Sequence, residues 1–332
     1  MSTWQPFPSA PNSDDKRGLL RPSSTREHHF IAQTEQRAFA FNPEVSDKNQ
    51  NVYRFEKKPH GRMARAQSVN IENNLEGVNL YLLRTAAQAD EQYNLEAWFN
   101  RYESAYDFAL TQLMTLPEGT HAINGAYEAV WRMKLLNILR NPYAATLPVG
   151  QYLHRCLRAR LPTLHHEIDN LQHTIAQHHR QQPYRAFGMD AAQYTAWLAV
   201  LCAALSEAVG KPSVFECFAA DWLNARAGTV HHALFRYRER QCLFGDSGLC
   251  AQYGAHADVY GMPLSARALI TAEIERTAWH KLPDLSPSYH APQGEFALLD
   301  EDDAVRAYFN RRTLHQCRHA VYGQSKRVQD YV

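Results

Sequence analysis

The sequence lacks several features that would place it in a specialised class of protein. Its 332 residues include six cysteines, and no two of these form a Cys-x-x-Cys pair. We therefore expect reduced thiols in a cytoplasmic protein rather than a disulfide framework. No apolar run is long enough to cross a bilayer, and no basic-then-apolar segment opens the chain. We expect neither a membrane partner nor a signal peptide.

A strong excess of charge is also missing. The formal net charge is +1 at pH 7, which excludes a strongly basic body, so any contact with nucleic acid must come from a local patch. Hydrophobic residues make up 45% and charged residues 21% of the chain, as in ordinary globular proteins. What the chain does have is histidine: 17 residues, several of them in adjacent pairs such as His28-His29.

The pattern of apolar and polar residues predicts an α+β protein: mostly a helical bundle with a small β-hairpin and a C-terminal helix. A segment rich in Pro, Ser and Asn over residues 1–26 is expected to be flexible, and 27–332 to form a single mainly helical domain. Alternation with period two predicts hairpin strands, whereas three- and four-residue steps predict helices. The expected parts are a hairpin over 27–60, a helical bundle insertion over 74–230, mixed strand and loop over 231–300, and a C-terminal helix over 301–328.

Two segments near opposite ends of the chain carry the strongest chemical pattern. His28 and His29 stand at the start of the first expected strand, and Asn310 is followed nine residues later by His319. In a ββα metal site, one histidine is the general base, and others hold a divalent cation that stabilises the charge on phosphorus. We assign His29 as the base, Asn310 as the residue that orients its imidazole, and His28 and His319 as metal ligands. The cofactor would be Mg, Mn, Zn or Ni.

Helix geometry bears on this assignment. Nine residues of a continuous helix turn through about 900°, so Asn310 and His319 would face opposite sides. The site can still form if the helix kinks near 309–313. Alternatively, His315 and His319, four residues apart, form the metal face themselves.

Asp246 is a further candidate, in Gly245-Asp246-Ser247-Gly248. An Asp in a tight turn is usually a turn former, and the alternative is a carboxylate that faces the metal. The same segment resembles the Gly-Asp-Ser turn of esterases, but no Asp-x-x-His follows Ser247 to supply the base. His165, Asp169 and His173 fall on one helical stripe, which is typical of a solvated face as well as of a metal site.

Basic residues gather close to both ends of the proposed site. Such clusters are typical of a phosphate-binding rim and equally of solvated helix faces. We assign nucleic-acid contact to Arg62, Arg65, Arg311, Arg312 and Arg318, with Lys326 and Arg327 following in the C-terminal cluster.

The order of motifs resembles a bacterial domain-of-unknown-function family whose members open with His-(Phe/Tyr)-Val-Pro-Gln. The matching segments are His29-Phe30-Ile31-Ala32-Gln33, Val52-Tyr53-Arg54-Phe55, Gly245-Asp246-Ser247-Gly248, Met262-Pro263-Leu264-Ser265 and Asn310. Ala32 departs from the usual Pro, and Ser247-Gly248 departs from Asn-Pro. That family is similar to HNH (His-Me finger) nucleases with a helical insertion between hairpin and helix. The resemblance implies that the two ends pair in space, in a nuclease that acts as a bacterial toxin or anti-phage effector.

These patterns predict metal-dependent hydrolysis of a phosphodiester in DNA or RNA. The alternative is a non-enzymatic helical scaffold that binds a protein partner, with structural histidines. The distance between the histidines of the two ends discriminates between these hypotheses.

Overall fold

The computed structural model describes residues 27–85, 88–161, 183–206, 211–224, 229–239, 241–281 and 288–332. The expected flexible segment over 1–26 and the histidine stripe over 165–173 lie outside these ranges. The α-helices within them are α1 Gln33–Arg37, α2 Glu96–Met114, α3 Gly125–Arg140, α4 Pro142–Ala145, α5 Pro148–Ala159, α7 Ala191–Leu205, α8 Val214–Leu223, α9 Arg276–Lys281 and α10 Asp303–Gln316. Short 3-10 turns are η1 Asp47–Asn49, η2 Pro59–Gly61, η3 Ile71–Asn73, η5 Pro183–Phe187 and η7 Val328–Tyr331.

The described strands fall into two larger sheets and two short pairs. A six-stranded sheet has the order β10-β11-β12-β8-β13-β7, and a four-stranded sheet has the order β3-β2-β14-β9. The pairs are β1-β4 and β5-β6. The bounds are β1 Glu27–His29, β2 Asn51–Glu56, β3 Gln67–Asn70, β4 Glu76–Val78, β5 Leu82–Thr85, β6 Gln88–Asn94, β7 Gly119–Ala122, β8 Val230–Arg236, β9 Phe244–Gly245, β10 Cys250–Tyr253, β11 Ala257–Ser265, β12 Ala268–Glu275, β13 Glu295–Asp300 and β14 Ala320–Gly323.

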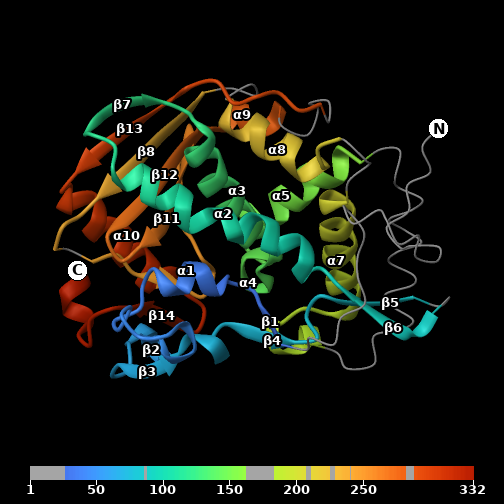
Figure 1. Cartoon of the computed structure of the whole chain (residues 1–332), viewed down its shortest axis with the longest axis horizontal. Coiled ribbons are helices and arrows are strands. Elements are labelled where there is room, and N and C mark those ends of the chain that lie inside the picture. The colour runs from blue at the N-terminus through green and yellow to red at the C-terminus, as the bar shows by residue number, and fades with distance from the viewer. Residues whose placement is uncertain are drawn as a thin grey trace.

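The predicted fold class, mostly a helical bundle, is wrong, because this is a mixed α+β fold. The helices α2, α3, α5, α7 and α8 gather beside the six-stranded sheet, and the two share one hydrophobic core (Figure 1). Most of the sheet comes from the chain after residue 228, where strands pair with partners far away in sequence. β13 lies parallel to β8, with Ala297 opposite Ala233. Such pairing depends on tertiary contacts, which local periodicity does not report.

Several helices begin where their capping residues predict. Asn124 Oδ1 accepts a hydrogen bond from the Tyr127 main-chain N–H at 3.0 Å and starts α3. Ser213 and Glu216 form a capping box at the start of α8. Both helices lie within the helical segment expected over residues 74–230.

The predicted hairpin over residues 27–60 is wrong. β1 pairs with β4, so that His28 lies opposite Gly77, whereas β2 pairs with β3 and with β14. The helix expected from residue 81 begins only at Glu96, after the β5-β6 pair. The C-terminal helix expected over 301–328 ends at Gln316, and strand β14 follows it.

The two ends of the described chain nevertheless meet. β2 pairs antiparallel with β14, and Arg54 lies opposite Tyr322. A small second core holds this sheet against α10 and η7, and consists of Phe55, Leu243, Cys317, Val321 and Tyr331. Figure 1 shows β2, β3, β14 and the C-terminus together below the larger sheet. The pairing brings the opening and closing segments side by side, as the sequence predicted, although through different strands.

All six cysteines are free thiols and are buried. Within the described ranges, no helix combines the length and the apolar character needed to span a bilayer.

Candidate functional site

A cavity of about 590 Å³ lies where the opening and closing segments meet, and we call it the junction cavity. One wall comes from the end of β1 and the η3-β4 turn, with Phe30, Asn74 and Glu76. The opposite wall carries the turn after α10 and strand β14, with His319 and Tyr322. Arg54, Glu56 and Lys57 on and after β2, Tyr143 of α4, Phe187 of η5 and Asp246 also line it.

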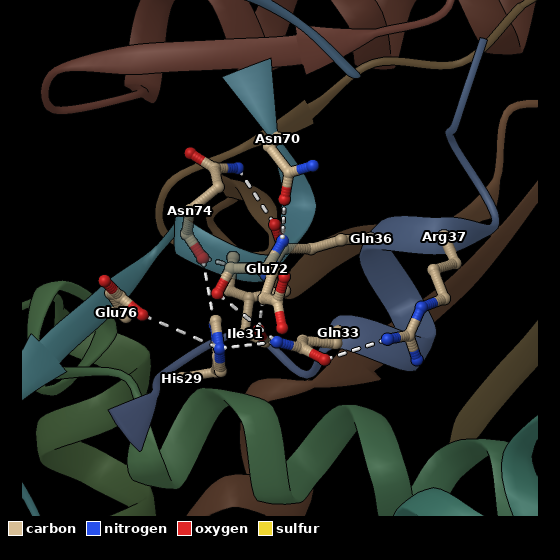
Figure 2. Close-up of polar contacts among 9 residues, drawn as sticks. All are labelled: His29, Ile31, Gln33, Gln36, Arg37, Asn70, Glu72, Asn74 and Glu76. Atoms are coloured by element: carbon tan, nitrogen blue, oxygen red, sulfur yellow. Dashed lines mark hydrogen bonds and ion pairs between the residues drawn. The ribbon is translucent and has the colours of Figure 1, made fainter. Parts of the chain in front are cut away.

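His29 lies directly behind the first wall, with 17% of its side chain exposed. Its Nδ1 is 3.0 Å from the Asn74 carbonyl oxygen, and its Nε2 is 2.7 Å from Gln33 Nε2. Glu76 Oε2 lies 3.8 Å from the same Nε2 atom. Figure 2 shows His29 between Asn74, Gln33 and Glu76, with Arg37 behind Gln33.

A directed chain of hydrogen bonds sets the tautomer of His29. Arg37 donates to Gln33 Oε1 at 2.9 Å, so the amide nitrogen of Gln33 must face the histidine and donate to it. Nε2 of His29 is therefore an acceptor, and the ring proton sits on Nδ1, where it is donated to the Asn74 carbonyl. The result is a neutral imidazole whose Nε2 accepts the Gln33 N–H, with Glu76 Oε2 3.8 Å from the same nitrogen.

The turn that carries Asn74 is held in place from several sides. Gln36 donates to the carbonyl oxygens of Ile31 at 2.8 Å and Asn74 at 3.2 Å, and the Asn74 amide donates back to Gln36 at 2.9 Å. Leu75 follows in the left-handed region with φ 56°, a conformation that costs about 1 kcal/mol or more for a residue with a Cβ atom. This strained residue turns the chain between the Asn74 carbonyl and Glu76, so backbone strain is stored next to the candidate site.

Burial shifts the pKa values of His29 and Glu76 in opposite directions. It lowers the pKa of His29, and the positive charges of Arg140 and Arg37 act in the same direction, whereas the hydrogen bond to Asn74 opposes them. Burial also raises the pKa of Glu76, with help from the negative charge of Glu27. Because His29 is neutral at pH 7, its 3.8 Å contact with Glu76 is not an ion pair at that pH.

His29 Nε2 and Glu76 Oε2 are two hydrogen-bond acceptors 3.8 Å apart, and a group that donates to both can bridge them. Glu76 Oε2 is buried and has no hydrogen-bond donor among the described residues. A polar contact longer than 3.5 Å is commonly bridged by water. A water that took the place of the Gln33 N–H at Nε2 would donate a proton to Nε2 and to Oε2, and its lone pairs would then point away from both. This is the arrangement in which a general base activates water for attack.

Asp246 organises the opposite wall. It is 1% exposed, and its carboxylate accepts main-chain N–H groups of Arg318 at 2.9 Å, His319 at 2.5 Å and Ala320 at 3.1 Å. The Asn141 side chain donates to the Asp246 carbonyl at 2.8 Å. Asp246 thus holds the turn that carries His319, and its oxygens are committed to the main chain rather than to a metal.

An aromatic side chain links the two walls. The ring of Tyr143 meets Phe30 edge-on at 5.4 Å and His319 at 5.2 Å. The Arg318 guanidinium lies 5.8 Å from the centre of the same ring. The neighbours of His29 and the residues of the closing segment therefore share one cavity.

Charge is divided unevenly over the cavity. Glu56 is balanced by Lys58 at 2.8 Å and Arg54 at 3.2 Å, and these cations lower its pKa. Asp246 is balanced by three main-chain donors. Arg54 Nε is buried without a hydrogen-bond partner in the described part of the chain. The wall formed by β2 and β14 is thus the electropositive side, and Glu76 is the negative charge facing it.

The structure places the predicted metal ligands apart. His28 is fully buried, accepts the Tyr81 N–H at 2.8 Å through Nδ1 and stacks on the Tyr81 ring. His315 is exposed on α10, and its carbonyl accepts from Lys57 at 2.6 Å. His319 follows the end of the helix, since Cys317 is already extended, so His315 and His319 do not share a helical face. No group of three His, Cys, Asp or Glu side chains suited to a metal occurs in the described residues.

The Asn310 side chain binds main-chain groups around the second core. Its Oδ1 accepts the Leu243 N–H at 2.8 Å, and its Nδ2 donates to the carbonyls of Gln241 at 2.9 Å and Tyr331 at 2.7 Å. The helix α10 runs unbroken through it, without the kink that we considered. We predicted that Asn310 orients the His29 imidazole. The groups that orient that ring are the Asn74 carbonyl and the Gln33 side chain.

The predicted basic residues divide between surfaces. Arg318 lies beside the junction cavity, whereas Arg311 and Arg312 lie on α10, where Arg312 donates to the Tyr308 hydroxyl at 3.0 Å. Arg62 is exposed in the loop after β2, and Arg65 lines a separate groove.

The sequence analysis missed the partners of His29. Gln33 stands four residues after His29 but on the next element, since β1 ends at His29 and α1 begins at Gln33, and Asn74 and Glu76 come from a turn remote in sequence.

No protein-family model, curated protein or solved structure matches this chain. The resemblance to HNH-type nucleases therefore stays a prediction from motifs, and the function has to be argued from the site.

Proposed function

We propose that the protein hydrolyses a phosphodiester of nucleic acid in the junction cavity, with His29 as the general base. The observation that supports it most is the chain from Arg37 through Gln33 to His29 and Asn74. It keeps the imidazole neutral, with Nε2 3.8 Å from Glu76, which lines a cavity that has ring faces and cations on its other walls.

The chemical step follows from that geometry. A water that hydrogen-bonds to Glu76 Oε2 displaces the Gln33 N–H from His29 Nε2 and gives a proton to that nitrogen, and its oxygen attacks phosphorus. The phosphorus–oxygen ester bond breaks, and the leaving oxygen takes a proton from solvent. Arg54, which lines the cavity beside Glu56, and Arg318 stabilise the negative charge that grows on the phosphoryl oxygens. Tyr143 and Phe187 supply ring faces for the bases on either side of the ester.

The predicted divalent metal finds two donors here, His29 Nε2 and Glu76 Oε2, and no third His, Cys, Asp or Glu joins them in the described part of the chain. Protein-held catalytic metals usually have three side-chain ligands. These residues do not fit a metal held by the protein alone, so the step above is derived without one.

The test is cleavage of fluorescent single-stranded DNA, duplex DNA and RNA, each with EDTA, Mg²⁺ or Mn²⁺. We expect activity in at least one substrate, a loss of 100-fold or more in His29→Gln, which is the order that general-base catalysis contributes, and a smaller loss in Glu76→Gln. His280→Gln, which changes an exposed histidine of α9, is the matched control. Thermal melting by circular dichroism verifies that each variant folds. Cleavage that persists at full rate in folded His29→Gln would remove the assignment.

A further inference from the structure

A second groove lies on the other face of the four-stranded sheet. Side chains alternate between the two faces of a strand, so Arg54 and Glu56 of β2 face the junction cavity, while Tyr53 and Phe55 face this groove. Its volume is about 660 Å³, and we call it the C-terminal groove. Figure 1 shows the strands β2, β3 and β14 close to the C-terminus.

Cations from the two ends of the chain meet in this groove. Arg65, in the segment that leads into β3, lines it together with Lys326 and Arg327, which follow β14. None of the residues that line it is an Asp or Glu. Two basic clusters that are separate in the sequence are therefore one surface feature in the fold.

Most of this positive charge is available to a ligand. Neither Arg65 nor Lys326 forms an ion pair with another described residue, and the Lys326 ammonium lies 5.7 Å from the centre of the Tyr53 ring. Arg327 pairs with Asp330 at 3.2 Å, but 76% of its side chain is exposed. Cation–π contact with Tyr53 keeps Lys326 at the groove without neutralising its charge.

We infer that the C-terminal groove binds the phosphate backbone of a single-stranded nucleic acid. A pocket for a small anion has convergent buried donors, whereas these three cations are exposed and lie along a groove. A basic groove that follows the backbone, with an aromatic ring beside it, is the common design for single strands. The inference rests on the proposed function only for the class of ligand, because the groove does not include any residue of the junction cavity.

The experiment measures fluorescence anisotropy of labelled twelve-nucleotide oligo-dT over a range of salt concentrations, in EDTA. Three phosphate contacts predict a slope of log K against log salt of about −2.1, and Lys326→Gln/Arg327→Gln should reduce it to about −0.7. At 0.1 M salt, affinity should fall by about 25-fold in that double variant. Lys211→Gln/Lys281→Gln, which removes two exposed lysines elsewhere, is the control and should bind as the wild type does.

Two further measurements complete the test. One distinguishes an oligonucleotide from a small anion as the ligand, and the other distinguishes the groove from the proposed hydrolytic site. Unlabelled oligo-dT should displace the probe far better than pyrophosphate at equal phosphate concentration, and equal displacement would mean a small-anion site and overturn the inference. His29→Gln should bind the probe normally, so failure of hydrolysis does not remove the groove. An unchanged slope in Lys326→Gln/Arg327→Gln, or an equal loss in the control, would refute it.

Discussion

Replacing Gln33 by Leu should raise the pKa of His29. In the wild type, Gln33 Nε2 donates to His29 Nε2 at 2.7 Å, and this bond exists only when Nε2 carries no proton. It therefore stabilises the neutral ring. Leu removes the donor at similar volume, and the neutral form loses a hydrogen bond that contributes about 1 kcal/mol net.

The size of the pKa shift follows from the free energy of the lost hydrogen bond. One pKa unit corresponds to about 1.36 kcal/mol, so the pKa of His29 should rise by about 0.7 unit. Burial still lowers the pKa in the variant, so the value should move back toward 6.5.

The assay is a titration of the histidine Cε1–H signals by NMR, with His29 assigned by its absence in His29→Gln. Gln193→Leu, on α7 and away from His29, is the control for a general effect of Gln-to-Leu replacement. A pKa for His29 that stays constant or falls in Gln33→Leu would refute the tautomer assigned above. If the proposed function is right, the acidic limb of the rate profile should shift upward with the same pKa.

Three other predictions concern stability. Asp246→Asn should lower the free energy of unfolding by about 3 kcal/mol in a urea titration at pH 7, because an amide has one acceptor oxygen for three main-chain donors. His232, whose pKa burial lowers to about 3, should make the protein less stable as the pH falls below 6.5, since the unfolded chain then binds a proton that the folded chain does not. His232→Phe should remove about 2 kcal/mol of the loss between pH 6.5 and 5 in urea titrations, and an identical pH profile would contradict this. Gly261→Ala should lower the melting temperature, because a Cβ atom there would lie 2.2 Å from Phe309 Cδ1, and Phe309→Leu should restore part of the loss.

The sequence predicted those parts of the fold that depend on local signals. Caps such as Asn124 and Ser213 lie within a few residues of the helices they start, so α3 and α8 were located from the sequence. The strands β8 and β13 could not be placed in the same way. Each is short, and each is stabilised by a partner more than sixty positions away, as when Ala233 lies opposite Ala297. An apolar residue every second position does not say which strand it will pair with.

The residues of the candidate site could also be predicted only in part from the sequence. His29 was singled out because a histidine pair at a strand start, taken with Asn310 and His319, matches the pattern of a ββα metal site, and Gln33 follows it four residues later at the start of α1. Glu76 and the Asn74 carbonyl could not be foreseen, because they reach His29 only through the η3-β4 turn and the strained Leu75. Asn310 matched the expected spacing, yet spacing alone does not distinguish a residue that orients a catalytic base from one that binds three main-chain groups of the second core.

The two walls of the cavity are held by different elements. Arg54 stands on β2, which is held by β14, and β14 begins where Asp246 binds the His319 turn. His29, in contrast, is held from β4 and α1, independently of β14. A perturbation of Asp246 should therefore displace the cationic wall while the histidine keeps its tautomer. If the proposed function is right, Asp246→Asn should weaken substrate binding and leave the NMR pKa of His29 near its wild-type value, because the cationic wall and His29 are held separately. Gln33→Leu should instead raise that pKa and leave substrate binding unchanged.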